Sequence, residues 1–268
     1  MSKINILCIG DIVGKAGRDV LNSSLESIQE EHQIDFTIAN LENAANGIGI
    51  TPKIYKELSK LPIQGFTSGN HIFDKREIIP IFNELPNVIR PLNFPTSNPG
   101  KGFMTFNYNG IRISIVNLIG QVFMRPYNSP FEAINQLLSK ENFSEDIVIV
   151  DFHKEATSEV LAMGYHLDGK ISALYGTHTH VQTADERILE NGTGYISDLG
   201  MTGSENSILG MKKDGIISQF ITNIHARKEP STKYPYMINA IVFTIDLKSK
   251  KTTNVKRLYN RYYGFDDM

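Results

Sequence analysis

Short apolar runs that stop at Gly, Asn or Asp recur along the chain. Runs of this length, rich in β-branched residues, are typical of buried strands. They predict strands at Ile4–Ile9, Phe36–Ala39, Gly65–Thr67, Ile113–Val116, Ile147–Val150 and Ile171–Tyr175. Between several of them, helical spacing and start signals predict helices at Arg18–Glu31, from Thr51-Pro52 through Leu61, at Ile78–Leu85 and at Ala156–Met163. This alternation predicts an α/β fold with a parallel or mixed sheet.

Two stretches break the alternation and predict antiparallel pairs. Phe103–Tyr108 and Ile111–Asn117 flank Asn109-Gly110, a dipeptide that suits the type I′ turn of a β-hairpin. Tyr236–Leu247 and Thr253–Tyr259 form the second pair, across a charged turn. A mixed sheet, or two sheets packed face to face between helices, accommodates both features.

Composition narrows the class of protein. The 268 residues are 41% hydrophobic and carry a formal charge of −2, so the net basic field that holds long nucleic acid is absent. The single cysteine, Cys8, excludes an intramolecular disulfide and favours a reduced, cytoplasmic setting. No apolar run approaches the ~20 residues of a membrane span. Nothing marks Pro91–Gly102 as an interdomain linker, so residues 1–268 are expected to form a single domain.

Polar residues gather where the predicted strands end. Ligands bind just beyond the carboxyl ends of strands in open α/β sheets, so these segments are expected to meet at one edge. They are Gly10-Asp11, Asn40-Leu41-Glu42-Asn43, Ser68-Gly69-Asn70-His71, Asp151-Phe152-His153 and Gly176-Thr177-His178-Thr179-His180.

Burying so many polar groups is costly unless a cation compensates them. Imidazole and oxygen donors without thiolate suit Zn, Mn, Fe or Co. The set exceeds the needs of one tetrahedral metal and suits two ions ~3.5–4 Å apart with a bridging carboxylate and a shared hydroxide. The candidate ligands are Asp11, Glu42, Asn43, Asn70, His153, His178 and His180.

Phosphoester hydrolysis is a reaction that two such metals perform well, since they neutralise phosphoryl oxygens and lower the pKa of bound water. The leaving alkoxide then needs a proton, which a histidine outside the ligand set can donate. His71, beside Asn70, is the candidate general acid.

These blocks, in this order, resemble the calcineurin-like metallophosphoesterases. Asp11-Ile12-Val13 departs from the Asp-x-His of that superfamily, and Glu42 stands where many members have a bridging Asp. Both departures match one branch, the YmdB-type bacterial phosphodiesterases. The similar strings run nearly end to end and include Ile9–Gly14, Glu42–Gly47, Gly69–His71, Glu155–Glu159, Gly176–Asp185 and Asp198–Gly203.

The resemblance implies a metallophosphoesterase fold, a four-layer α/β/β/α sandwich of two mixed sheets, with a two-metal centre that holds iron or, as alternatives, manganese or zinc. It implies that Glu42 bridges the metals and that His71 is the proton donor. It assigns Asp11, Glu42, Asn43 and His180 to one metal, and Glu42, Asn70, His153 and His178 to the other. Asp198 and Thr202 are candidates to line the site or to support a ligating histidine, of which the second is favoured, and Arg18 is expected to be structural or exposed.

The implied activity is hydrolysis of small cyclic nucleotides, 2′,3′-cyclic and additionally 3′,5′-cyclic, by a metal-bridging hydroxide with His71 as acid. The expected partner is a small phosphodiester, and the expected assembly is a homo-oligomer. Two alternatives stay open. One is a phosphomonoesterase or nuclease on the same centre. The other is a regulatory nucleotide-binding module with incidental turnover, against which His71 argues, because a pure binder needs no leaving-group acid.

Overall fold

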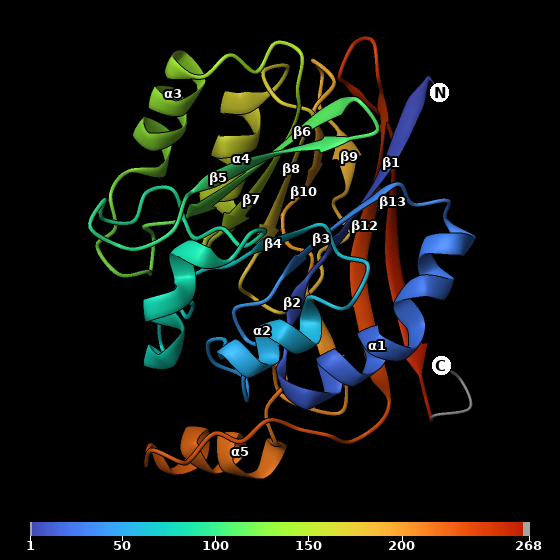
Figure 1. Ribbon diagram of the computed structural model, residues 1–268. Helices are drawn as coiled ribbons and strands as arrows, with labels where there is room; N and C mark the ends of the chain where they lie inside the picture. The colour runs from blue at the N-terminus through green and yellow to red at the C-terminus, as the bar shows by residue number, and fades with distance from the viewer. Residues whose placement is uncertain (1, 265–268) are drawn as a thin grey trace.

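The computed structural model of the protein describes residues 2–264 and contains two mixed sheets packed face to face (Figure 1). The first sheet has the order β2 (Asp11–Ile12), β11 (Met201–Ser204), β12 (Tyr236–Asp246), β1 (Lys3–Ile9), β3 (Phe36–Asn40) and β4 (Gly65–Thr67), with β13 (Thr252–Tyr262) paired to β12. The second has the order β5 (Phe103–Tyr108), β6 (Ile111–Ile119), β7 (Ile147–His153), β8 (Ala173–Thr177), β10 (Gly194–Ile196) and β9 (Arg187–Ile188).

A buried apolar layer separates the two sheets. Ile6 of β1 and Phe243 of β12 belong to the same cluster as Ile115 of β6, Ile149 of β7 and Tyr175 of β8. Strands that are buried on both faces need apolar residues at successive positions, which is why they read as continuous runs in the sequence.

Helices cover the outer faces of both sheets. The helices α1 (Gly14–Glu31) and α2 (Pro52–Leu58) and the 3-10 helix η1 (Arg76–Glu84) pack on the first sheet. The helices α3 (Pro130–Lys140) and α4 (Thr157–Leu167) pack on the second. The helix α5 (Lys213–Thr222) lies apart from the sandwich, at the bottom of Figure 1. The predicted four-layer α/β/β/α architecture is therefore confirmed.

The parallel strands bring distant segments to one edge. β3 lies between β1 and β4 and is parallel to both, so the chain leaves all three strands on the same side. In the second sheet β7 and β8 are parallel in the same way, with His153 opposite Thr177. The segments that follow these strands carry the polar residues predicted to meet.

Several predicted element boundaries were wrong in detail. The first helix begins at Gly14 rather than Arg18, and the second ends at Leu58 rather than Leu61. The segment predicted as a helix from Ile78 is a 3-10 helix from Arg76, because Pro80 removes a backbone donor inside it. The helix after β7 extends to Leu167, and the strand predicted from Ile171 begins at Ala173.

The sequence patterns did not indicate α3, α5 or the short strands β9, β10 and β11. Both predicted antiparallel pairs are present. In the hairpin, Asn109 (φ 51°) and Gly110 (φ 80°) take the two positive φ values of a type I′ turn. Within residues 2–264, none of the helices is long and apolar enough to cross a bilayer.

Candidate metal centre

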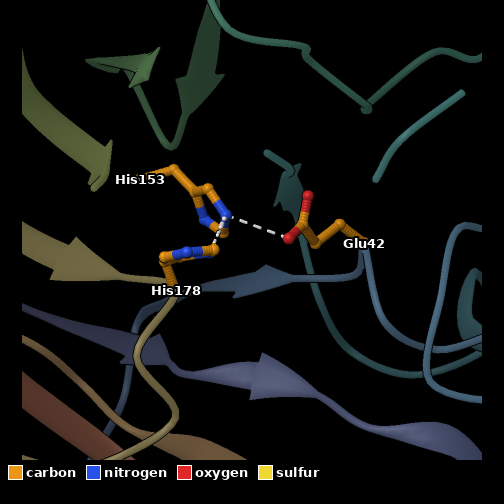
Figure 2. Close-up of side chains that lie close together, drawn as sticks. All are labelled: Glu42, His153 and His178. Atoms are coloured by element: carbon orange, nitrogen blue, oxygen red, sulfur yellow. Dashed lines mark hydrogen bonds and ion pairs between the residues drawn. The ribbon is translucent and has the colours of Figure 1, made fainter. Parts of the chain in front are cut away.

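Three other segments converge on the ring of His153, at the end of β7. Figure 2 shows His153, His178 and Glu42 directed toward one another. His153 Nε2 lies 2.9 Å from Glu42 Oε1, 3.0 Å from Asn70 Oδ1 and 3.0 Å from His178 Nδ1. One ring nitrogen carries at most one hydrogen, so it cannot satisfy three neighbours by hydrogen bonding. Lone-pair donors gathered around one point are what a metal ion requires.

The remaining predicted ligands lie beside this cluster. Asn43 Oδ1 is 3.4 Å from His180 Nε2. Asp11 is fully buried, and its Oδ2 accepts a hydrogen bond of 3.1 Å from the backbone N–H of His178. Its Oδ1 has no hydrogen-bond partner among the described residues. A buried carboxylate oxygen without a partner is costly, and a cation would compensate it. The donor set therefore fits metal ions.

The orientation of the His153 ring is set from the neighbouring strand. Its Nδ1 lies 2.9 Å from the hydroxyl of Thr177, which in turn donates a 2.7 Å hydrogen bond to Asp151 Oδ1. Because the Thr177 hydrogen goes to the carboxylate, Nδ1 of His153 is the donor to the hydroxyl. In the neutral ring Nε2 then carries the lone pair, on the side of Glu42, and this is the tautomer that binds a metal.

His178 and His180 lie on a segment that leaves β8 with unusual backbone geometry. Their φ angles are 104° and 64°, in the region that non-glycine residues seldom adopt. His178 Nε2 lies 3.1 Å from Glu155 Oε2, which leaves Nδ1 for the cluster. His180 Nδ1 donates a 3.1 Å hydrogen bond to the carbonyl of Leu209, which leaves Nε2 on the side of Asn43.

Charge reinforces the pairing of Glu42 with His153. Burial alone would raise the pKa of Glu42, but the charge and hydrogen bond of His153 outweigh it and lower that pKa to about 2. Burial would likewise lower the pKa of His153, yet Glu42 raises it to about 9. These opposite shifts share one cause, the mutual attraction of the two side chains, so the space beside Glu42 favours a positive charge.

The two histidines after β8 are held in the neutral form. Burial, with the nearby charge of His153, lowers the pKa of His178 to about 3. Burial also lowers the pKa of His180. Neutral imidazole is the form that binds a metal, so both rings are ready to act as ligands at neutral pH.

His71 has a different environment. Its backbone N–H donates a 2.9 Å hydrogen bond to Glu42 Oε2, and its Nδ1 lies 2.7 Å from Asp74 Oδ2. The carboxylate accepts, so Nδ1 carries a hydrogen and Nε2 is the ring nitrogen left for another group. His71 also lines a cavity of about 430 Å³ together with Glu42, Asn43, His178 and His180. His71 therefore borders the donor cluster without belonging to it.

A buried ion pair supports the histidine segment. Lys154 Nζ lies 3.0 Å from Asp198 Oδ2, and both side chains are almost fully buried. Asp198 also accepts from the backbone N–H groups of Thr179 and Gly200, at 3.2 and 2.8 Å. Asp198 therefore acts on the backbone between the two histidines and not on a ring.

The contacts of Thr202 and Arg18 test two further expectations from the sequence. The hydroxyl of Thr202 has no hydrogen-bond partner within the described chain, so it is not a support for a histidine ring there. Arg18 is structural, as expected, because it pairs with Glu57 at 2.9 Å and donates to the carbonyl of Ala44.

Asp151 and Thr177 stood in segments predicted to meet, but the sequence analysis gave no supporting role to these two residues or to Asp74, Lys154, Glu155 and Leu209. Only Asp151 had a usable signal. It precedes His153 by two positions in a predicted strand, and such residues share a face of the sheet.

Comparisons with known proteins show which family the chain resembles. The family model described as "YmdB-like protein" matches residues 7–258. A Bacillus subtilis protein named 2′,3′-cyclic-nucleotide 2′-phosphodiesterase is 42% identical over 258 residues, which cover 95% of this chain and 96% of that protein. The crystal structure of a protein described as a novel phosphatase, from Mycoplasma pneumoniae, superposes with a TM-score of 0.93 at 31% identity, covering 98% of this chain and 95% of that one. The NAD nucleotidase of Haemophilus influenzae shares only the fold, with a TM-score of 0.61 at 10% identity, covering 97% of this chain and 56% of that one.

Proposed function

Because the chain belongs to the YmdB-like protein family of phosphoester hydrolases, we propose that it hydrolyses small cyclic nucleotides at a two-metal centre. The substrates proposed are 2′,3′-cyclic nucleotides, as in the name of the Bacillus subtilis relative, and also 3′,5′-cyclic ones. The observation that carries the proposal is the convergence of Glu42, Asn70 and His178 on His153 Nε2, with His71 in the adjoining cavity.

The proposed ligand sets share Glu42. Its Oε1 lies by His153, and its Oε2 accepts the backbone N–H of His71. One set is Asp11, Glu42, Asn43 and His180, and the other is Glu42, Asn70, His153 and His178. These residues would hold two cations, proposed to be iron with manganese or zinc as alternatives, which would neutralise phosphoryl oxygens and lower the pKa of bound water.

His71 is proposed as the general acid. Its ring is held by Asp74 through Nδ1, and its backbone is held by Glu42. When the ring is protonated on both nitrogens, these contacts leave the Nε2 hydrogen to be given to the ribose oxygen that departs as the cyclic diester opens, and the ring becomes neutral with its hydrogen on Nδ1. A ribose alkoxide is a poor leaving group, so the protein gains most from this proton on its natural class of substrate.

The leaving group makes the role of His71 testable. We expect His71→Ala to lower kcat for 2′,3′-cyclic AMP by about 100-fold, the scale of general acid catalysis. For bis(p-nitrophenyl) phosphate, kcat should fall by less than about tenfold, since nitrophenolate departs without a proton. Steady-state rates with manganese measure both, and His166→Ala, a histidine bound to Asn135 away from the site, is the control. Equal losses on the two substrates would contradict the role.

A second candidate function has one observation in its favour, because the similar Mycoplasma pneumoniae structure is described as a phosphatase. A phosphomonoesterase would hydrolyse p-nitrophenyl phosphate faster than a cyclic nucleotide under the same metal. The proposed diesterase predicts the opposite order of kcat/KM.

We also propose that residues 1–268 act as a single domain, in a cytoplasmic homo-oligomer whose size light scattering would give.

A further inference from the structure

The cavity that contains His71 has two chemically different halves. At one end are the polar side chains of the metal centre. Most of the remaining wall is apolar and comes from the loop after β3, the turn at 208–211 and α5, and Lys228 adds one charged side chain to it. Its apolar side chains are Ile48, Ile208, Leu209, Met211, Ile216 and Phe220. A substrate whose phosphate lies at the polar end would extend along this apolar wall.

The turn at 208–211 is built under strain. Ile208 and Met211 exchange two backbone hydrogen bonds, of 2.9 and 3.0 Å, around Leu209 (φ 52°) and Gly210 (φ 87°). A leucine in the left-handed region is strained and persists only where its surroundings hold it. The carbonyl of Leu209 accepts from His180 Nδ1 at 3.1 Å. The same turn therefore positions a proposed metal ligand and part of the apolar wall.

Tight packing fixes the turn against the ligand-bearing loops. A Cβ on Gly210 would lie 2.4 Å from Val13 Cγ1, two residues after Asp11. A Cβ on Gly47 would lie 2.4 Å from Met211 Cε, and Gly47 belongs to the loop that carries Glu42. The distance between the metal centre and this part of the wall is thus set by van der Waals contact.

Phe220 completes the wall from α5. Its side chain is 84% exposed although it lines the cavity, so an aromatic face is available at the cavity mouth. A volume of about 430 Å³ lies within the range of small-molecule sites, ~300–1,000 Å³. A flat apolar surface beside a phosphoester site suits a nucleobase, because bases stack on aromatic side chains.

We propose that the apolar half of this cavity binds the nucleobase of the substrate, and that Phe220 is the stacking residue. The inference rests on the proposed hydrolysis of cyclic nucleotides and adds a specificity subsite to it. Ile208, Leu209 and Met211 form the wall nearest the metal centre, and Phe220 closes the mouth. The subsite distinguishes a nucleotide from a cyclic phosphodiester that lacks a base.

A kinetic comparison tests the subsite. For Phe220→Ala, the ratio of kcat/KM for 2′,3′-cyclic AMP to that for ribose 2′,3′-cyclic phosphate should fall by about tenfold, the scale of losing one base stack. Ile221→Ala is the matched control, since Ile221 is on the same helix, 78% exposed, and outside the residues that line the cavity. An unchanged ratio in Phe220→Ala overturns the subsite and leaves the hydrolase intact.

A binding measurement is independent of turnover. The sequence contains no tryptophan, so Phe220→Trp carries a single reporter. Saturable fluorescence quenching by adenosine 2′-monophosphate is expected in this variant. Phe123→Trp is the comparison, because Phe123 is 88% exposed and lines a different cavity with Asn70 and Arg125.

The subsite is overturned if quenching occurs only in Phe123→Trp, if it is equal in both variants, or if it is absent from both. If the wild type hydrolyses no cyclic phosphodiester, the proposed function fails, and quenching in Phe220→Trp alone then decides whether the cavity binds a base.

Discussion

The absence of a Cβ at Gly69 makes room for the ring of His153. A Cβ at this position would lie 2.3 Å from Nε2 and Cδ2 of His153. The ring cannot retreat, because it is fully buried and its Nδ1 is held by Thr177. Glycine is required here by the close approach of the ring and not by a turn. Asn70, the next residue, thereby reaches the same ring nitrogen.

Gly69→Ala is expected to displace His153 and to weaken the metal centre. We predict a loss of about 1–3 kcal/mol in the free energy of unfolding, the cost of overpacking, and a manganese affinity about 10–100-fold weaker. Urea unfolding and metal titration measure the two effects. Gly215→Ala in α5 is the control, because the nearest atom to its Cβ would be at 3.4 Å. Wild-type manganese affinity in Gly69→Ala would show that the ring is free to shift.

At the scale of elements, the buried pair of Lys154 and Asp198 joins the end of β7 to the segment after β10. The side chains are 2% and 1% exposed, and Asp198 also holds the backbone of Thr179 and Gly200. A buried charge that loses its partner is strongly destabilising, although the intact pair adds little net stability. The pair therefore sets the position of the histidine segment more than it strengthens the fold.

Lys154→Met is expected to lower the free energy of unfolding by about 3–5 kcal/mol, because Asp198 is then left buried without its cation. Adding Asp198→Asn should recover part of the loss, since the unpaired charge is removed. Urea unfolding of the metal-free protein measures both. Lys212→Met, from an exposed pair with Glu229, should change stability by ~0–1 kcal/mol. A similarly small effect of Lys154→Met would refute the assigned role.

At the scale of the whole molecule, the proposed metal centre lies where the two sheets meet. Glu42 and Asn70 follow strands of the first sheet, whereas His153 ends β7 and His178 follows β8 in the second. Each sheet supplies only part of the donor set, so metal affinity depends on how the two sheets are packed. Metal bound to the folded state alone must in turn stabilise that packing.

Manganese at 100 times its dissociation constant should raise the free energy of unfolding by about 2.7 kcal/mol per site. Chelation should remove the gain, and His153→Ala should lose most of it. Calcium at the same concentration is the control, since it prefers oxygen ligands over imidazole. The midpoints of urea unfolding with and without each ion measure this stabilisation. An equal manganese shift in His153→Ala would place the bound metal elsewhere.

Local chemistry explains which elements could be predicted. Asn109-Gly110 specifies its own turn, and Thr51-Pro52 marks a helix start at which Thr51 accepts from the backbone of Ile54. Ser129-Pro130 starts α3 with the same chemistry and could have been recognised. α5 had no comparable signal, because its apolar residues are exposed and show no buried face beyond Ile216.

The sequence by itself determined the kind of site: histidines, carboxylates and amides placed just after buried strands, which parallel pairing must bring to one edge. Only the tertiary structure decided which ring nitrogen of His153 faces Glu42, that Asp74 holds His71, and that the turn carrying Leu209 adjoins the metal centre. The physical reason is the separation along the chain over which each interaction acts. Strand and turn preferences act between neighbours in the chain, whereas ring orientation and cavity shape depend on contacts between residues far apart in sequence.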